Sequence, residues 1–288
     1  IKRAYQRRPN AARDHLLQEA VDSWTSQGLC VEGVPHHLLP LLLVDKKLSA
    51  KKRACANAVS INAATVPMQF PLPHIDSATR LLSDIPPDGL FGCIDLVNAF
   101  MQVRLHPDNP QIGFVAPNGK TYVFQRVFFG AVNAPSWFQS RMSLQCSDAH
   151  MASFSVIYMD DIGYKASSPA AFVANTRYIF ERIDHCHLRL SGAKCFLGTP
   201  TLSLLGYVVS PQCISSDPQK LQGVLNLQPP SSLSSLRSLV GVLNFLRPFV
   251  HNFSSILHPI TSRMSTKIPF SWTPEMQDSL DQIKDALL

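Results

Sequence analysis

Two adjacent aspartates inside an apolar run constrain the fold of this chain more than any other feature. Asp160 and Asp161 stand in the segment VIYMDDIG, residues 156–163, with apolar residues on both sides. Neighbouring residues of a strand point to opposite faces, so the two carboxylates converge on one site only if they lie at the turn of a hairpin. The sequence therefore predicts strands over residues 154–158 and 162–166, joined by a turn that carries the acids.

A third carboxylate follows another apolar strand. Asp95 stands at the end of the strand predicted over residues 90–96, in the segment FGCIDLVNAF. A carboxylate in such surroundings is costly to keep ionised, whereas a bound divalent cation favours its charge. Taken alone, Asp95 is explained as a helix cap, and Asp160 with Asp161 as an Asx turn. Together, the three acids indicate a site for Mg²⁺, which prefers oxygen ligands and shares its other positions with phosphates.

Composition limits the class of protein. Of 288 residues, 45% are hydrophobic and 16% are charged, which excludes a disordered tail and a charge-rich coiled coil. The longest apolar stretch, residues 38–44, contains a proline and is far shorter than the roughly 20 residues of a membrane-spanning helix. The sequence predicts a globular protein without a membrane span.

Charge and cysteine usage point to a basic protein of a reducing compartment. The net charge is +6, and residues 1–53 hold ten basic and five acidic residues. Such a balance suits a polyanionic partner such as nucleic acid. The seven cysteines form no CxxC pair and the histidines no HExxH, so we expect neither a zinc site nor a disulfide framework. Because the chain opens with Ile1 and no apolar signal follows, we expect a piece of a longer polypeptide.

The hydrophobic periodicity changes along the chain. Up to about residue 210 it predicts mixed helices and strands, and beyond residue 211 it predicts a separate, basic helical unit. Apart from the three strands above, the predicted elements are helices over residues 9–30, 75–82, 133–146, 170–187 and 234–249, a hairpin over 113–124, and strands over 39–44 and 203–210.

The acidic segments belong to a larger ordered set of blocks. These are PLPHID at 71–76, IDLVNAF at 94–100, VRLHP at 103–107, FFGAVNAP at 128–135, YMDD at 158–161, LSGAKCFLG at 190–198, LGYVVS at 205–210, LVGVLNFLRPFVHNFS at 239–254 and FSWTPE at 270–275. They resemble reverse transcriptases, most closely those of Ty3/gypsy-type LTR retrotransposons and their retroviral relatives. The resemblance covers nearly the whole chain and implies an RNA-directed DNA polymerase that copies retroelement RNA into DNA.

The resemblance also implies an architecture. It is an α+β right-hand polymerase whose palm is an antiparallel sheet backed by helices. The fingers would comprise residues 1–65 and 105–128, the palm residues 66–104 and 129–212, and the thumb with the start of a connection residues 213–288.

Four residues match the catalytic motifs of the family. Asp95, Asp160 and Asp161 match its metal-binding triad, which would hold two Mg²⁺ ions, or Mn²⁺ in their place. Lys194 matches a lysine near the leaving pyrophosphate that could act as a proton donor. The resemblance therefore implies two-metal nucleotidyl transfer.

Other residues match the substrate-binding segments. Phe100 matches the aromatic residue over C2′ of the incoming sugar, where a 2′-hydroxyl would clash. The remaining nucleotide-binding positions are Lys46 and Arg53 in the fingers and Leu96, Phe129 and Gly130 around the pocket. The primer grip matches Leu205, Gly206 and Tyr207, and Arg237 and Arg247 in the thumb are candidates for phosphate contacts.

The resemblance implies partners as well. They are an RNA or DNA template with its primer, dNTPs, and adjoining RNase H and integrase regions of a polyprotein, in the cytoplasm within a virus-like particle or in the nucleus.

Two alternative functions remain open at the level of sequence. An RNA-dependent RNA polymerase on a similar palm would prefer a small or polar residue in place of Phe100. A degenerate or host-adopted copy that binds nucleic acid without polymerising would fit the altered residues 57–59, where relatives usually have Asp-Tyr-Arg and this chain has Asn-Ala-Val. The intact aspartate triad favours the polymerase.

Overall fold

We describe the protein from a computed structural model, which describes residues 10–45, 52–106, 111–265 and 269–287. The chain divides into two compact units. Unit 1 comprises residues 1–82 and 90–199, and unit 2 comprises residues 83–89 and 200–288. Each unit is described by itself, and the finer division into fingers, palm and thumb stays a prediction.

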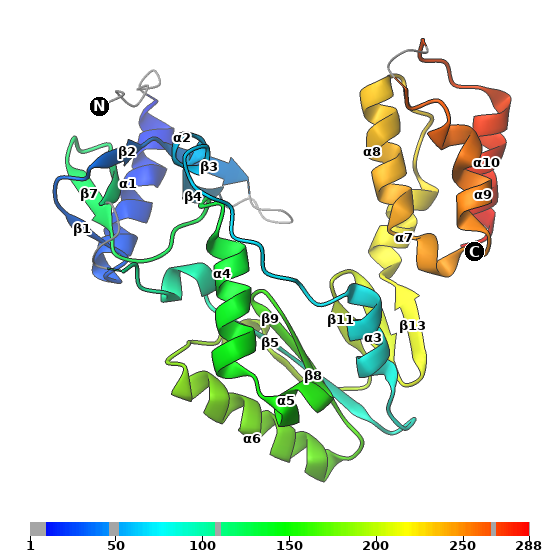
Figure 1. The fold of residues 1–288 in the computed structure, drawn as a ribbon, viewed down its shortest axis with the longest axis horizontal. Coiled ribbons are helices and arrows are strands. Elements are labelled where there is room, and N and C mark those ends of the chain that lie inside the picture. Colours follow the sequence, from blue (N-terminus) through cyan, green and yellow to red (C-terminus); the bar gives the residue numbers. More distant parts are fainter. Residues whose placement is uncertain (1–9, 46–51, 107–110, 266–268, 288) are drawn as a thin grey trace. The chain divides into compact units, whose positions relative to one another are not determined.

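Unit 1 mixes helices with three antiparallel or mixed sheets (Figure 1). Its strands are β1 (Cys30–Glu32), β2 (His37–Leu39), β3 (Leu41–Asp45), β4 (Lys52–Ala56), β5 (Leu90–Asp95), β6 (Ile112–Val115), β7 (Thr121–Phe124), β8 (Ser155–Tyr158), β9 (Asp161–Ala166) and β10 (Phe196–Thr199). Its helices are α1 (Ala11–Ser26), α2 (Val59–Asn62), α3 (Ile75–Ser83), α4 (Ala134–Arg141), α5 (Ala149–Phe154) and α6 (Pro169–His185), with the short helical turns η1 (Ala99–Gln102), η2 (Met142–Cys146) and η3 (Gly192–Lys194).

The central sheet of unit 1 has the strand order β10-β5-β9-β8, and all of its neighbouring strands are antiparallel. Helices α4, α5 and α6 contribute Phe138, Met151 and Ile179 to the core against this sheet. Ser168 begins α6 because its hydroxyl accepts the N–H of Ala171, and Pro169 occupies the first turn, where its missing N–H costs little. The expected antiparallel sheet with helices behind it is therefore present.

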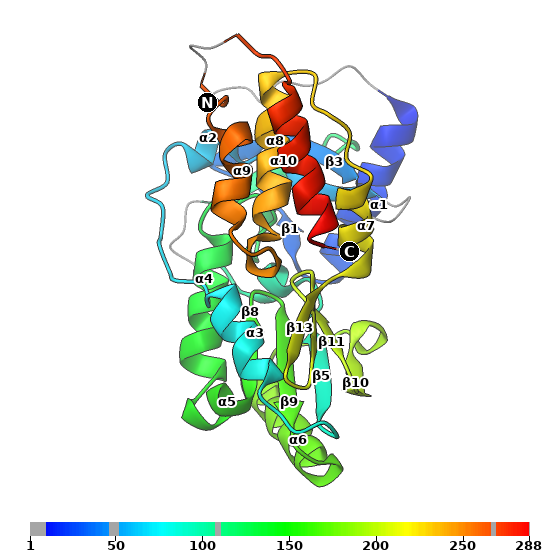
Figure 2. The same ribbon diagram turned by 90° about the vertical axis from the view of Figure 1, so that its right-hand side faces the viewer.

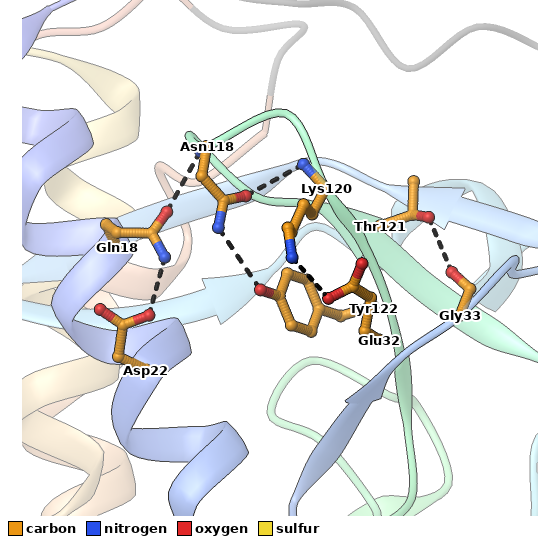
Figure 3. Close-up of polar contacts among 8 residues, drawn as sticks. All are labelled: Gln18, Asp22, Glu32, Gly33, Asn118, Lys120, Thr121 and Tyr122. Atoms are coloured by element: carbon orange, nitrogen blue, oxygen red, sulfur yellow. Dashed lines mark hydrogen bonds and ion pairs between the residues drawn. The ribbon is translucent and has the colours of Figure 1, made fainter.

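A second sheet of unit 1, with the order β1-β7-β6-β2, packs against α1. The ring of Trp24 on α1 meets Phe114 edge-on, with 5.7 Å between ring centroids. Figure 3 shows how the β6–β7 turn is tied to its surroundings: the Asn118 N–H donates to Gln18 of α1, and Lys120 pairs with Glu32 of β1 at 2.8 Å. Gly119 takes a φ of +82° in this turn, which confirms the predicted hairpin.

Unit 2 is a small sheet followed by a helical bundle (Figure 2). Its elements are β11 (Leu202–Leu204), β12 (Tyr207–Ser210), β13 (Cys213–Ser216), α7 (Pro218–Leu225), α8 (Leu233–Asn244), η4 (Arg247–Phe249), α9 (Phe253–Thr261) and α10 (Pro274–Asp285). Ser232 and Ser235 form a capping box at the start of α8. Apolar side chains of all four helices form one core, which confirms the predicted helical unit.

Three sequence-based expectations about the fold are wrong. The strand predicted over residues 203–210 is a hairpin, because Leu205 and Gly206 take φ values of +54° and +87° between β11 and β12. The helix predicted over residues 133–146 changes at Met142 into a π-helical turn, and the helix predicted over 234–249 ends at Asn244.

The cysteine expectation also needs a correction. Cys146 and Cys186 form a disulfide, with 6.1 Å between their Cα atoms. They lie 40 residues apart, and packing of α6 against η2 brings them together. Arg182 of α6 supports this packing, since its guanidinium donates to the carbonyls of Gln145 and Cys146.

No helix among the described residues is long and apolar enough to cross a membrane.

Candidate active site

The ends of two neighbouring strands bring the three aspartates together. Asp95, the last residue of β5, lies directly opposite Asp161, the first residue of β9. Asp160 lies in the two-residue turn between β8 and β9, and its carbonyl accepts the N–H of Leu96 at 3.0 Å. Only Asp160 occupies the turn itself, so Asp161 reaches the site from the strand rather than from the turn as expected.

A buried glutamine supports the turn that carries Asp160. Met159, the other turn residue, has a φ of +56°, which side chains other than glycine rarely adopt. Its N–H donates to Oε1 of Gln139 at 2.7 Å, while Nε2 of Gln139 donates to the carbonyl of Ile157 at 3.0 Å. Gln139 is fully buried on α4. Sequence reasoning missed this residue, because the segment APSWFQSR mixes polar and apolar residues and does not mark its glutamine as buried.

Lys194 forms an ion pair at the centre of the site. Its ammonium lies 2.9 Å from Oδ1 and 3.0 Å from Oδ2 of Asp95. The Asp95 carbonyl accepts the N–H of Ser191, which anchors the segment leading to η3 and Lys194. Asp95 is the less exposed partner, with 15% of its side chain accessible.

Burial and like charges act on Asp161. Burial raises the pKa of this carboxyl to about 6, with further increases from the nearby carboxylates of Asp160 and Asp95, and the ammonium of Lys194 opposes them. The ionised form of the Asp161 carboxyl is therefore destabilised by burial and by the two neighbouring carboxylates.

The donor chemistry of the site fits a divalent cation. Three carboxylates supply only oxygen ligands, and the carboxylates of Asp160 and Asp95 add to the effect of burial in raising the pKa of Asp161. Within the described residues no cluster of three His, Cys, Asp or Glu side chains is close enough to hold a metal as it stands. Lys194 partly takes the place of a cation, since it already holds both oxygens of Asp95.

A small cavity of about 50 Å³ adjoins Asp160. Its lining brings together six of the residues predicted from sequence, with Asn98 and Ala99 completing it: Arg53, Leu96, Phe100, Phe129, Asp160 and Lys194. They come from β4, from the end of β5, from η1 and from the loops before α4 and β9, together with η3. Residues far apart in the sequence thus form one site within unit 1.

Aromatic packing holds Phe100 in the cavity wall. Its ring packs edge-on against Phe129 and Phe138, with centroid distances of 5.9 Å and 5.6 Å. The guanidinium of Arg53 lies over the ring of Phe129, 4.7 Å from its centroid. Gly130 follows with a φ of +107°, and a Cβ there would lie 2.8 Å from the carbonyl oxygen of Ala56.

The segment after Phe129 is fixed by Asn62. Its Nδ2 donates to the carbonyl of Gly130 at 2.8 Å and its Oδ1 accepts the N–H of Val132 at 3.0 Å. The altered residues 57–59 lead directly into the short helix α2 that carries Asn62. In this chain the connection between α2 and the pocket is therefore present with Asn-Ala-Val at residues 57–59.

The three predicted primer-grip residues lie in unit 2. Leu205 and Gly206 form the turn of the β11–β12 hairpin, and Tyr207 packs on Phe245 with 4.9 Å between ring centroids. Lys220 of α7 lies over this turn: its ammonium is 3.4 Å from the Leu205 carbonyl oxygen and 4.1 Å from the Phe245 centroid.

The other predicted residues are placed as follows. Lys46 lies outside the described residues. Arg247 donates to Ser254 and Asn244 and so braces the bundle of unit 2. Arg237 is exposed on α8 and donates to the carbonyl of Met264 at 3.3 Å.

Comparisons with known proteins give the family of the chain. Residues 45–209, more than half of the chain, match the family described as reverse transcriptase (RNA-dependent DNA polymerase). The chain is 28% identical over 277 residues to the retrovirus-related Pol polyprotein from transposon 412 of Drosophila melanogaster, which covers 94% of this chain and 22% of that protein. It is 24% identical over 273 residues to the transposon Tf2-3 polyprotein of Schizosaccharomyces pombe, covering 94% of this chain and 20% of that protein. The chain thus spans about a fifth of these relatives.

Solved structures give the fold. The foamy viral protease-reverse transcriptase dRH in complex with ds DNA is similar with a TM-score of 0.86 and 23% identity, over 99% of this chain and 49% of that one. The same foamy viral protein in complex with an RNA/DNA hybrid is similar with a TM-score of 0.80, over 99% of this chain and 38% of that one. The fold is that of a right-hand polymerase, and the chain belongs to the reverse transcriptase (RNA-dependent DNA polymerase) family, of the kind found in retrotransposon Pol polyproteins.

Proposed function

We propose that this chain extends a primer along an RNA template by adding deoxynucleotides to the primer 3′ end. The observation that supports the proposal most is the meeting of Asp95, Asp160 and Asp161 beside the cavity lined by Phe100 and Phe129. Phosphoryl transfer needs charge placed next to the reacting phosphate and a wall that positions the nucleotide. This site offers both.

The three aspartates would hold two Mg²⁺ ions, which when bound would activate the primer 3′-hydroxyl and stabilise the leaving pyrophosphate. The remaining work falls to side chains of the chain itself. Arg53 is held over the Phe129 ring with a planar guanidinium suited to bidentate contact with phosphate oxygens. Lys194 lies at the same cavity and would donate a proton to the leaving group.

Phe100 would select the sugar. Its ring lines the cavity and is buttressed by Phe129 and Phe138, so it cannot move aside without disturbing both. A 2′-hydroxyl on the incoming nucleotide would meet this ring, whereas a deoxyribose would not. The second candidate function is an RNA-dependent RNA polymerase. The ring of Phe100 favours the DNA polymerase over it, because the ring would clash with a 2′-hydroxyl.

The β11–β12 turn of unit 2 would guide the primer end. Leu205 and Gly206 form a tight turn, and Tyr207 next to it is buried and packs on Phe245. Template, primer and dNTPs are thus the proposed partners, together with the RNase H and integrase regions of a longer polyprotein. The foamy viral relative in complex with ds DNA supports a nucleic-acid partner for this fold.

Primer extension on a primed RNA template tests the proposal. With Mg²⁺ present, we expect extension with dNTPs and little or none with NTPs. Preferential use of NTPs would support an RNA polymerase instead. Tight binding of the primed template without extension by dNTPs or NTPs would support the non-catalytic copy. The altered residues 57–59 are the observation that suggests this alternative.

A further inference from the structure

Gln102 makes an unusual set of contacts for a half-buried glutamine. It is the last residue of η1, two positions after Phe100. Its Nε2 donates to the carbonyl oxygens of Val97 at 2.6 Å and Arg189 at 2.9 Å, and its Oε1 accepts the N–H of Arg189 at 2.6 Å. Every bond of the amide goes to main chain, so the side chain acts as a connector between two backbone segments.

The two connected segments both belong to the active site. Residues 97–102 carry Phe100, and residues 189–194 carry Lys194. The two segments are separated by at least 87 positions in the sequence. The backbone adds its own bonds between them, from Val97 N–H to the Arg189 carbonyl at 3.0 Å and from Ser191 N–H to the Asp95 carbonyl at 2.8 Å. Gln102 closes this connection at the end farther from Asp95.

A further contact comes from a third segment of the chain. Nη1 of Arg126, which follows β7, donates to the carbonyl of Gln102 at 2.7 Å. Backbone and side chain of Gln102 are therefore both engaged, and the rotation of η1 about its axis is restricted from two sides.

The turn that carries Phe100 begins at an exposed backbone position of unusual conformation. Asn98, at its start, has a φ of +45°, and Val97 and Asn98 are exposed. Within the turn the backbone contributes Met101 N–H to the Asn98 carbonyl at 2.7 Å and Val103 N–H to the Phe100 carbonyl at 3.2 Å. A side chain that selects by volume must be held to within roughly 0.5 Å to do so.

From these contacts we infer that Gln102 is a positioning residue for sugar selection: it fixes the turn that carries Phe100 to the backbone segment that leads to Lys194. This inference rests on the proposed polymerase function. Gln102 touches neither the cavity nor a reacting atom, so it acts through Phe100. Loss of its bonds would let the ring retreat and admit a 2′-hydroxyl, while the aspartates and the chemical step would stay intact.

Gln102→Met tests this inference, since methionine keeps the length and flexibility of the side chain and removes all three amide bonds. In single-nucleotide incorporation on a primed RNA template, we expect the preference for dCTP over CTP to fall about tenfold, with kcat for dCTP within about threefold of wild type. Gln125→Met is the matched control, because Gln125 is exposed and its side chain makes no hydrogen bond to any described residue. An unchanged preference in Gln102→Met overturns the inference.

A double-mutant cycle shows whether Gln102 acts through Phe100. If it does, Gln102→Met adds no further loss of preference to Phe100→Val, because the ring that it positions is already gone. Additive losses would mean that Gln102 affects sugar choice by another route and would also overturn the inference. Gln102→Glu, which keeps the acceptor for the Arg189 N–H and loses both donated bonds, serves if the methionine variant does not fold.

Amide hydrogen exchange separates this inference from the proposed function. Gln102→Met should speed exchange in peptides covering residues 96–102 and 188–194, and Gln125→Met should not. Unchanged exchange overturns the connection whatever the activity. If wild type fails to extend a primer, the proposed polymerase fails and the role in sugar choice fails with it, while the exchange result still decides whether Gln102 joins the two segments.

Discussion

The Lys194 ammonium holds both carboxylate oxygens of Asp95, at 2.9 Å and 3.0 Å. The same two residues are joined through the backbone, since the Asp95 carbonyl accepts the N–H of Ser191 in the segment that leads to Lys194. A cationic side chain is thus held against one of the three aspartates, and in the proposed reaction it would act on the leaving pyrophosphate. The pair is largely open on the lysine side, with 58% of the Lys194 side chain exposed, so its importance lies in chemistry more than in stability.

Replacement of this lysine should slow chemistry and spare binding. Lys194→Gln removes the proton donor, and general acid catalysis contributes roughly 100-fold or more, so we expect a loss of about that size in the incorporation rate at saturating dNTP. The dissociation constant for the primed template should stay unchanged. Rapid-quench kinetics measure the first and fluorescence titration the second. Lys120→Gln, which breaks the surface ion pair with Glu32, is the control, and equal rates in the two variants would rule out the role of Lys194.

The carboxylates should destabilise the metal-free protein above neutral pH. The pKa of Asp161 is raised to about 6 from an ordinary value of 3.8, by burial first and then by Asp160 and Asp95. Because the folded state holds this proton more tightly than the unfolded state, the free energy of unfolding falls as the pH rises from about 4 through about 6.

Asp161→Asn should abolish that part of the pH dependence and make the protein more stable than wild type at about pH 8, when urea unfolding is measured in a chelator. Asp184→Asn, an exposed change on α6, should retain the wild-type dependence. A pH dependence in Asp161→Asn equal to that of wild type would show that the carboxyl is not strained. Added Mg²⁺ should restore stability to wild type at the higher pH, since a bound cation balances the charges.

Phe100 should control the choice between dNTPs and NTPs. Phe100→Val opens the cavity wall beside the sugar and removes no group that touches the reacting phosphate, so CTP should become a substrate at a modest cost in dCTP incorporation. The ratio of kcat/KM values for dCTP and CTP measures this. Phe180→Val on α6 is the control. A ratio within about threefold of wild type, less than roughly 0.7 kcal/mol of discrimination, would leave Phe100 as a packing residue only.

Gly206 should be required for the β11–β12 turn. Its φ is +87°, and a Cβ there would lie 1.7 Å from Nζ of Lys220. Gly206→Ala should lower the free energy of unfolding by about 1–2 kcal/mol from backbone strain, with an added loss from the contact with Lys220. Lys220→Ala, made together with Gly206→Ala, should remove the loss that comes from the contact with Lys220 and leave the loss that comes from backbone strain.

Gly241→Ala is the matched control for this turn, because Gly241 lies inside α8, an added Cβ there would meet no atom within 4 Å, and its φ is not positive. It should stabilise unit 2 by roughly 0.5–1 kcal/mol, since alanine favours a helix interior. Thermal or urea unfolding checks both changes. A Gly206→Ala protein as stable as wild type would show that the turn can adopt another conformation.

The sequence predicts the strands around the aspartates well because two adjacent acids interrupt an otherwise apolar run there. Residues 154–158 and 162–166 were predicted, and β8 and β9 cover Ser155–Tyr158 and Asp161–Ala166. The β11–β12 hairpin was missed because its turn is formed by Leu205 in a conformation that leucine rarely adopts, inside a run with no polar interruption. Only Gly206 indicated a break.

Contacts between distant segments could not be predicted from local pattern. The Cys146–Cys186 disulfide depends on how α6 packs on η2, and cysteine spacing carries no trace of it. Gln139 and Gln102 bond to backbone atoms that lie up to 87 residues away. The proposed roles of Arg53 in phosphate binding and of Lys194 in proton donation come only from the resemblance to a family. Their position in the wall of the same cavity depends on the fold.

The measurement that tests the central claim most directly is primer extension on a primed RNA template by wild type and Asp160→Asn with Mg²⁺ and dNTPs. Asparagine keeps the shape of the β8–β9 turn and removes one charge from the metal ligands, so the variant should fold and bind the template normally and lose most of the extension rate, at least about 100-fold. Asp184→Asn should extend at the wild-type rate. Extension by Asp160→Asn within a few-fold of wild type would contradict the assignment of Asp95, Asp160 and Asp161 as the catalytic centre.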